Sequence, residues 1–373
     1  MSVDFSGREL RLARTFHGLA LDELASRVEK TRQYLHKLET GATKPTDQLT
    51  RELAAALQVD IEFLGSGRHL IPSDDQFHFR KLFTTRVGIK QVAMARGELV
   101  GRIVNYLDSE LKLPDLRIPE VELSGTQDEI ERTAEMCRSE WGLGLGPIAN
   151  MNRLAESIGA VVTSFKSLSK EVDALSIALP RPIIVRNDAK ESICRQRFDI
   201  GHELGHFVMH RGVVTGDRAT ESQANRFSSA LLIPRAMMLK LFPRPRGTRL
   251  DWMGIRDFKL TWKVSKAAIF YRARQLNLIS DDQYKTGVIT LRRNGEAGGE
   301  REDHLIQDER PELLLHSFKV LADKRSVFTE DVAHALHMSR PFLCDVIGFS
   351  GPSRKSGEAT PNSARPALFL VTS

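Results

Sequence analysis

The chain has few cysteines and no long apolar run, and each absence excludes a class of protein. Its three cysteines, Cys137, Cys194 and Cys344, are far apart and odd in number. They predict neither a disulfide framework nor a cysteine zinc site, and they favour a reducing compartment. No apolar stretch approaches the roughly 20 residues that a membrane-spanning helix needs. Charges stand near the N-terminus where a signal peptide would be apolar, so we expect a cytoplasmic protein without a membrane partner.

The composition is that of a globular chain with more than one domain. Hydrophobic residues make up 41% and charged residues 27% of the sequence, which excludes a disordered or fibrous protein. A length of 373 residues exceeds one ordinary core and predicts two or three domains. The net charge of +6 permits contact with nucleic acid without requiring it.

The first 68 residues have the pattern of short amphipathic helices. Apolar residues recur at helical spacing, and Gly18, Gly41 and Pro45 separate the runs, so about five helices are expected. The second and third form a predicted helix-turn-helix. The segment holds ten Lys and Arg and ten Asp and Glu, so contact with DNA must depend on a local basic face.

The rest of the chain is expected to be mainly helical with a small sheet. Three β-branched runs predict its strands, at 159–165, 173–180 and 181–187. The polar, Gly-rich segment 287–310 is expected to be a linker or a loose hairpin. Helical patterns predict helices at 77–112, 127–141, 148–158, around 198–212, around 220–234, at 260–278 and at 311–348.

The stretch FDIGHELGHFVMHRG, residues 198–212, carries three histidines and a glutamate. His202 and His206 are four residues apart, so on a helix both can bind one Zn²⁺ from the same face. Glu203 would lie beside that ion, where it can take a proton from the attacking water and pass it to the leaving amine. This is the H-E-x-x-H pattern of metalloproteases. His210 is about 12 Å from His202 along a helix axis, so a packing or supporting role fits it better than coordination.

A third metal ligand is expected on the next helix, TESQANRFSSALLIP. Apolar residues at i, i+3 and i+7 from Ala224 mark its buried face, and Glu221 falls on the same face. A carboxylate there costs several kcal/mol unless something pairs with it, and a metal ion would. The pattern predicts a zinc site of His202, His206 and Glu221 with water in the fourth position.

These motifs resemble the ImmA/IrrE family of metallo-endopeptidases, in which two histidines and a glutamate before an Ala-Asn pair bind zinc. The resemblance rests on FDIGHELGH and ESQANRFSSALLIP, and extends to FHFRKLF, WGLGLGPI, DALSIAL, RQRF and VSKAAIFYRARQLNLIS. It implies that His202, His206 and Glu221 are ligands and that Glu203 is the general base. Gly201 stands where the family usually has alanine.

Two further features of this region have more than one interpretation. Asn225 and Arg197 either orient the site or a substrate carbonyl, or make hydrogen bonds on the helix surface. The strand near residues 173–179 either pairs with an extended substrate peptide or is an ordinary member of the sheet.

The stretch ELASRVEKTRQYLHKLETGATKP resembles the Cro/C1-type helix-turn-helix, with residues 31–40 as the recognition helix. Residues at the start of such a helix read bases in the major groove. The resemblance therefore predicts base contacts by four side chains and phosphate contacts by two others. The base readers are Arg32, Gln33, His36 and Lys37, and the phosphate contacts are Lys30 and Lys44.

This stretch departs from the helix-turn-helix pattern at several positions. Glu29 occupies the turn position usually taken by glycine, Lys30 takes an apolar position, and Ala20 and Leu21 replace a serine cap and a glutamine. Loss of the cap costs about 1 kcal/mol. The alternative to DNA binding is a dimerisation or partner-docking module, and a homodimer is left open.

The expected architecture is an all-α helix-turn-helix domain followed by a mainly helical α+β zincin-like metallopeptidase domain and a small helical C-terminal region. The expected boundaries are 1–68 for the helix-turn-helix, 69–145 for a helical linker region, 146–286 for the peptidase, 287–350 for the C-terminal helices and 351–373 for a disordered tail.

The resemblance implies a zinc-dependent endopeptidase that cleaves a regulatory protein, above all a transcriptional repressor, in transcription regulation and stress response. The alternative is a DNA-binding regulator or antitoxin whose metallopeptidase-like domain senses or binds without turnover.

Overall fold

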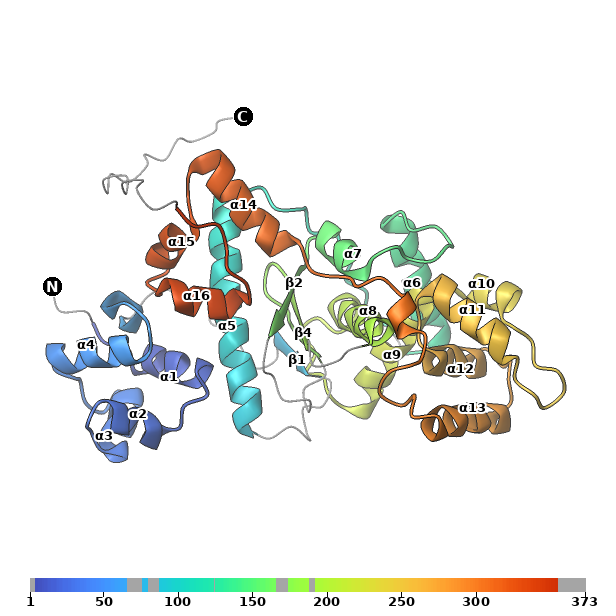
Figure 1. The fold of residues 1–373 in the computed structure, drawn as a ribbon, viewed down its shortest axis with the longest axis horizontal. Helices are drawn as coiled ribbons and strands as arrows, with labels where there is room; N and C mark the ends of the chain where they lie inside the picture. Colours follow the sequence, from blue (N-terminus) through green and yellow to red (C-terminus); the bar gives the residue numbers. More distant parts are fainter. Residues whose placement is uncertain are drawn as a thin grey trace.

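The computed structural model describes residues 4–65, 76–79, 87–123, 125–165, 174–187 and 192–354 (Figure 1). Its elements are, in chain order, α1 (Gly7–Phe16), α2 (Leu21–Arg27), α3 (Arg32–Glu39), α4 (Asp47–Ala56), η1 (Ile61–Leu64), β1 (Phe77–Phe79), α5 (Val87–Glu110), α6 (Gln127–Glu140), α7 (Met151–Ser157), β2 (Val161–Phe165), β3 (Ala174–Ile177), β4 (Ile183–Asn187), α8 (Ile193–Met209), α9 (Arg218–Leu232), α10 (Arg235–Leu241), α11 (Trp252–Trp262), α12 (Lys266–Gln275), α13 (Asp281–Arg293), η3 (Asp303–Leu305), α14 (Leu313–Arg325), α15 (Thr329–Ala335) and α16 (Arg340–Ile347). The predicted fold class is confirmed: helix-turn-helix helices precede a mostly helical domain with a small mixed sheet.

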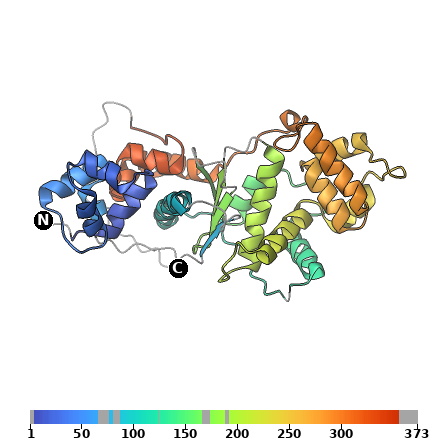
Figure 2. The same cartoon turned by 90° about the horizontal axis from the view of Figure 1, so that it is seen from below.

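The described elements form an elongated molecule with the sheet near its middle. In both views the helices α1 to α4 lie at one end and α10 to α13 at the other (Figures 1 and 2). The long helix α5 stands between α1–α4 and the sheet, and α8 lies on the other face of the sheet (Figure 2). None of the described helices combines the length and apolar character that a membrane span requires.

Among the described residues, four strands form one sheet in the order β1-β3-β4-β2. β2 runs parallel to β4, whereas β3 pairs antiparallel with both β4 and β1. Because neighbouring side chains in a strand point to opposite faces, Val161 and Val162 belong to different hydrophobic cores, as do Ile183 and Ile184. The sheet therefore separates a core on the α5 side from a core on the α8 side.

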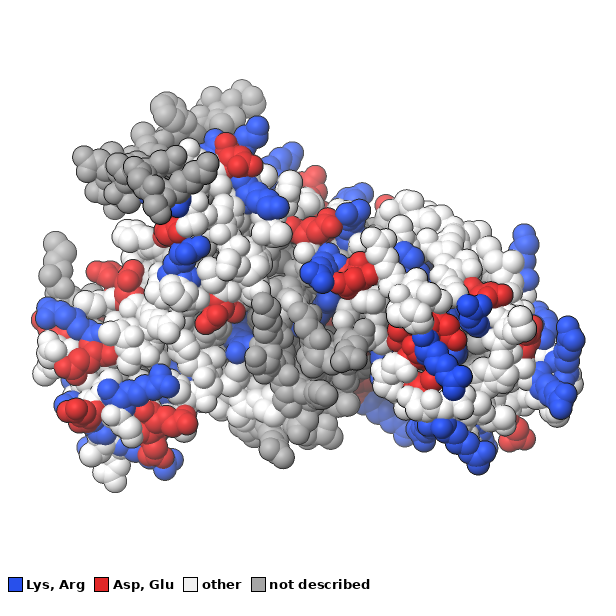
Figure 3. Space-filling model, viewed as in Figure 1, with Lys and Arg blue, Asp and Glu red and all other residues white. Residues whose placement is uncertain are grey.

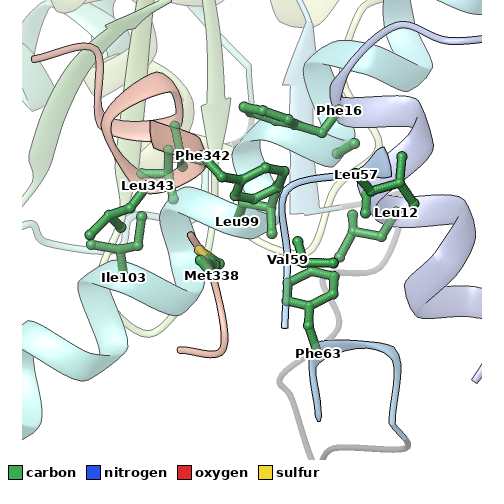
Figure 4. Packing of buried hydrophobic residues seen from close by; sticks show 14 of the residues in the cluster. Leu12, Phe16, Leu57, Val59, Phe63, Leu99, Ile103, Met338, Phe342 and Leu343 are labelled. Atoms are coloured by element: carbon green, nitrogen blue, oxygen red, sulfur yellow. The ribbon is translucent and has the colours of Figure 1, made fainter. Parts of the chain in front are cut away.

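The core on the α5 side joins segments from both ends of the sequence. Leu12, Phe16 and Phe63 of the N-terminal helices pack with Leu99 of α5 and Phe342 of α16 (Figure 4). The Phe342 ring lies 4.6 Å from the Phe16 ring and 6.1 Å from the Phe63 ring, measured between centroids. The helix-turn-helix region and the C-terminal helices thus share one apolar core instead of folding around separate ones.

Polar contacts hold the same segments together. The turn after α4 and the turn after α15 exchange two backbone hydrogen bonds, from Asp60 N to His337 O at 2.9 Å and from Ser339 N to Gln58 O at 3.0 Å. The buried Arg102 guanidinium of α5 makes ion pairs with Glu9 of α1 at 2.8 Å and with Glu98 at 2.7 Å. Removing one member of such a buried pair costs about 3–5 kcal/mol. These contacts fix how α1 lies against α5.

Three sequence expectations need correction. The helix expected from residue 77 does not include Phe77–Phe79, because these residues form strand β1, held by pairing with β3, and the described part of the helix is α5. The stretch 260–278 belongs to two helices, α11 and α12, divided by Lys263 in the left-handed conformation (φ 52°). The segment 287–310 begins inside α13 and is not a loose hairpin.

The polar residues after α13 pair with two buried lysines. Lys259 of α11 is fully buried and contacts Glu300 at 2.6 Å and Asp303. Lys266 of α12 pairs with Glu296 and Glu302, each at 2.7 Å. A segment that looks like a linker from composition is therefore fixed by buried charges. The expected disordered tail, 351–373, lies outside the described residues from position 355 onward.

We predict that Phe342→Ala destabilises the helix-turn-helix helices together with α16. Truncation of a buried Phe costs about 3–5 kcal/mol, and here the cavity would open between both segments. Amide hydrogen exchange should rise in α1, α4 and α16 alike. Unchanged amide exchange in α1 and α4 would show that the stability of these helices does not depend on packing against Phe342.

Candidate metal centre

The two histidines of H-E-x-x-H lie on α8, which is buried between the sheet and α9. Gly201 and Gly205 let the two helices approach closely, because a Cβ at Gly201 would lie 2.6 Å from Ser228 Oγ and one at Gly205 would lie 3.0 Å from the Phe227 ring. This contact accounts for glycine at position 201, where an alanine Cβ would displace the Ser228 hydroxyl from its hydrogen bond to Phe198 O. Asp217 begins α9 by accepting the N–H groups of Ala219 and Thr220.

The structure brings His202, His206 and Glu221 together. The Nε2 atoms of the two histidines are 3.0 Å apart, and the Glu221 carboxylate lies 3.3 Å from His202 Nε2 and 3.4 Å from His206 Nε2. One ligand atom from each residue lies within 4.8 Å of the others. Both imidazoles are almost completely buried, at 0% and 1% exposure. The three residues that the sequence predicted as ligands thus form one compact group.

The hydrogen bonds behind the imidazoles indicate which nitrogen carries the proton. His202 Nδ1 lies 3.1 Å from Asn225 Oδ1, which can only accept, so Nδ1 donates and Nε2 keeps its lone pair. His206 Nδ1 lies 2.9 Å from His210 Nδ1, and His210 Nε2 lies 2.7 Å from Gln223 Oε1. The Gln223 oxygen accepts from His210 Nε2, which leaves His210 Nδ1 to accept from His206. Both Nε2 lone pairs then face Glu221.

The charges of the three groups suit a cation. Burial lowers the pKa of His206 to about 3, so its imidazole is neutral at pH 7. Burial opposes ionisation of Glu221, but its interactions with His202 and His206 outweigh burial and lower its pKa to about 2. Two neutral imidazoles and a carboxylate are the donor set of a catalytic zinc site, and the residues present fit this ion.

Glu203 is fully buried beside this group of three candidate ligands. Its carboxylate accepts a hydrogen bond from the Ser176 hydroxyl of β3. Burial raises the pKa of Glu203 to about 7, and the nearby carboxylates of Glu221 and Asp199 add to that shift. A carboxyl group that titrates near neutral pH can both accept and return a proton, which is what a general base in hydrolysis must do.

Strand β1 also reaches this centre, which no pattern in the sequence indicates. His78 is buried opposite Ser176 in the ladder, and its ring stacks on that of His206 with centroids 5.3 Å apart. Its Nδ1 lies 2.7 Å from the Thr215 hydroxyl. The stretch FHFRKLF resembles the family, but no spacing rule links residue 78 to residue 206.

Two interpretations left open by the sequence can now be separated. Arg197 bonds to Ile148 O at 2.8 Å, to Lys263 O at 3.0 Å and to Glu309, so its guanidinium joins three segments and does not orient a substrate. Asn225 orients His202. The edge of β3 expected to receive a peptide is paired with β1, and an extended peptide can take that edge only where β1 has left it.

The predicted DNA-reading residues lie far from this centre, on and around α3 (Figure 1). Arg32, Gln33, His36 and Lys37 are all exposed, as are Lys30 and Lys44. Leu35 and Leu38 fill the opposite, buried side of α3. Lys44 lies 3.1 Å from Asp4, which would compete with a phosphate.

The unusual residues of the helix-turn-helix have visible effects. Glu29 adopts φ 50°, the left-handed conformation that glycine takes without strain, so the turn is formed at some cost. Ala20 offers no side-chain cap, but the Glu23 carboxylate accepts the Ala20 N–H at 2.7 Å and begins α2 in its place.

Comparison with protein families agrees with this geometry. Residues 155–274 match the model of the IrrE N-terminal-like domain, and residues 7–63 match that of a helix-turn-helix domain. The chain carries an IrrE N-terminal-like domain behind a helix-turn-helix domain. The resemblance drawn from the motifs is thereby confirmed, and the IrrE N-terminal-like match spans His202, Glu203, His206 and Glu221 but not β1. None of the curated proteins compared with the chain matches it.

We predict that the hydrogen bond accepted by His210 supports metal affinity. His210→Phe removes the acceptor for His206 and should weaken zinc binding about 10–100-fold, whereas His210→Gln can still accept and should keep most of the affinity. Glu221→Ala should lose the metal under the same conditions. Titration against a coloured chelator measures all three, and unchanged affinity in His210→Phe would contradict the tautomer assignment.

Proposed function

We propose that the chain is a zinc-dependent endopeptidase that cleaves a regulatory protein, with a transcriptional repressor as the first candidate. The observation that carries the proposal is the convergence of two Nε2 lone pairs and the Glu221 carboxylate, with Glu203 beside them. A bound zinc would polarise the scissile carbonyl and acidify the attacking water.

Glu203 supplies the proton transfers in this proposal. It takes a proton as the water oxygen bonds to the carbonyl carbon, and it returns the proton to the leaving nitrogen as the C–N bond breaks. Ser176 holds one carboxylate oxygen, which limits the rotation of the side chain. Asn225 and His210 keep the imidazoles in the tautomers that present Nε2.

We further propose that the helix-turn-helix domain binds DNA through α3, so that proteolysis and DNA binding occur in one chain. Support comes from the helix-turn-helix match and from the exposed Arg32, Gln33, His36 and Lys37. Lys30 and Lys44 would contact phosphates at the two ends of the helix.

One observation favours a second candidate function, a DNA-binding regulator whose metal centre senses without cleaving. His202, Glu203 and His206 are at most 1% exposed, and the outer edge of β3 is occupied. A peptide bond reaches these groups only after β1 or its surroundings move.

The cleavage proposal predicts that Glu203→Gln abolishes proteolysis without losing the metal. Loss of a general base lowers the rate about 10²–10⁴-fold. Candidate repressors are incubated with zinc-loaded wild-type and variant chains, and the products are identified by mass spectrometry. Equal cutting by both chains, at equal zinc content, would exclude Glu203 as the base. If neither chain cuts any candidate, the sensor is favoured.

The DNA proposal predicts different effects for two substitutions. Arg32→Ala should weaken binding to the preferred sequence about 10–100-fold, while Lys30→Ala should weaken binding to all sequences and lower the salt dependence by about one unit of slope. Lys319→Ala on α14 is the matched control. Salt-titrated binding of labelled duplexes measures these effects, and a loss no greater than in the control would show that α3 is not the reading helix.

A further inference from the structure

The segment between α10 and α11 forms a defined β-hairpin. Arg246 and Arg249 exchange two backbone hydrogen bonds, from Arg246 N to Arg249 O at 2.9 Å and from Arg249 N to Arg246 O at 3.1 Å. Gly247 and Thr248 make the two-residue turn, and Gly247 takes φ 60°. A glycine with positive φ at the first turn position is typical of a type II′ hairpin. The two arginines are therefore held directly opposite each other.

Contacts at the tip and the base fix this hairpin on the domain. Gln283 of α13 donates from Nε2 to Gly247 O at 3.0 Å, while its Oε1 accepts the Ser280 N–H at 2.8 Å. At the base, Phe242 is buried and Leu250 packs against the core on the α8 side. The arginines thus project from an ordered scaffold, at the end of the molecule opposite α1–α4 (Figures 1 and 2).

The hairpin concentrates positive charge without compensation. Lys240, Arg244, Arg246 and Arg249 are exposed, and within the described part of the chain none of them forms an ion pair with a carboxylate. The nearest acid in sequence, Asp251, is occupied in accepting the Gly254 N–H at 3.0 Å. Like charges directly opposite in a ladder repel each other, so an anionic partner would relieve the Arg246–Arg249 pair. Figure 3 shows Lys and Arg side chains at this end of the molecule.

Apolar side chains lie next to the charges. Leu239, Leu241 and Met253 are exposed by 44%, 45% and 78%, at the end of α10 and in the first turn of α11. The two helices meet at the base of the hairpin, where Arg244 donates to Leu239 O and Gly254 packs against Pro243. Phosphate backbones make no use of such apolar groups, whereas protein interfaces are enriched in arginine and methionine. Charge and apolar surface together favour a protein over a nucleic acid.

We propose that residues 239–253, the basic hairpin surface, form a docking site for an acidic segment of a partner protein that also carries apolar side chains. If the chain is a peptidase, the partner that docks there is its substrate. The hairpin then binds a part of the substrate that is distant from the cleaved bond. This last step rests on the proposed function, whereas the docking itself does not.

Binding is tested on the full-length, zinc-loaded Glu203→Gln chain, which cannot consume its ligand. The probe is a fluorescein-labelled peptide of about 16 residues that alternates glutamate with leucine, and a labelled random duplex of about 20 base pairs is the comparison. Anisotropy should show peptide binding that weakens about tenfold or more in Arg246→Glu/Arg249→Glu. Met253→Ser should weaken it as well, since the apolar part contributes.

The matched control is Lys319→Glu/Lys324→Glu, which changes the net charge equally on α14 and should leave binding within about twofold. Circular dichroism checks that each variant is folded, and Arg246→Gln/Arg249→Gln replaces the reversal if it unfolds. Absent peptide binding, equal losses in hairpin and control variants, or duplex binding that depends on the hairpin would each overturn the proposal.

The substrate role has its own readout in the active chain. With casein as an acidic protein substrate, the hairpin variant should raise KM with unchanged kcat, and cleavage of a short quenched peptide should stay the same. Equal KM values would overturn the substrate role. If the wild-type chain cuts neither, the proposed proteolysis fails and the binding result stands by itself.

Discussion

Two imidazoles and an ionised carboxylate, gathered at one point between α8 and α9, form a donor set that suits a cation. This constraint accounts for much of the surrounding structure. α8 and α9 must approach closely, which Gly201 and Gly205 permit, so that Glu221 reaches the histidines. The far sides of the rings must be hydrogen-bonded, which Asn225 and His210 provide. Polar side chains that would otherwise destabilise an apolar helix interface are explained by this one interaction.

The sheet transmits this arrangement to the rest of the chain. On one face Ser176 and His78 reach the centre, and on the other the strands pack on α5 and α16, which share a core with the helix-turn-helix. A change at β1 or β3 therefore has a packed route toward α1. Such a route is what a chain combining a peptidase-like domain with a DNA-binding type of domain needs if one activity is to depend on the other.

Residue spacing and β-branched runs in the sequence predicted those features of the structure that depend on neighbouring residues. The i, i+4 spacing of His202 and His206 and the helical face of Glu221 were sufficient to predict their grouping, and β-branched runs predicted three of the four strands. Long-range pairing was not predictable in this way. Phe77–Phe79 is a strand because β3 offers it an edge, and the hydrogen bonds of Asp60 with His337 and of Ser339 with Gln58 join residues that no periodicity connects. Glu300, a buried partner of Lys259, lies in a segment whose composition predicts a polar linker. Composition does not show which charges are buried.

The residues that surround the candidate metal centre were predictable only in part. The motif places His210 too far from His202 along the helix to bind the same metal ion. Its role as a hydrogen-bond acceptor depends on Gln223, thirteen residues onward on another helix. Arg197 looked like a site residue because it is close in sequence, yet its contacts lead to Glu309 and away from the ligands. Local sequence patterns predicted the grouping of His202, His206 and Glu221 well and their surroundings poorly.

X-ray absorption at the zinc edge of the purified, zinc-loaded chain tests the central claim most directly. The account predicts one zinc per chain with four nitrogen and oxygen ligands at about 2.0–2.2 Å, two of them with the scattering signature of imidazole. A sulfur shell at about 2.3 Å, or zinc that keeps the same spectrum in Glu221→Ala, would contradict it.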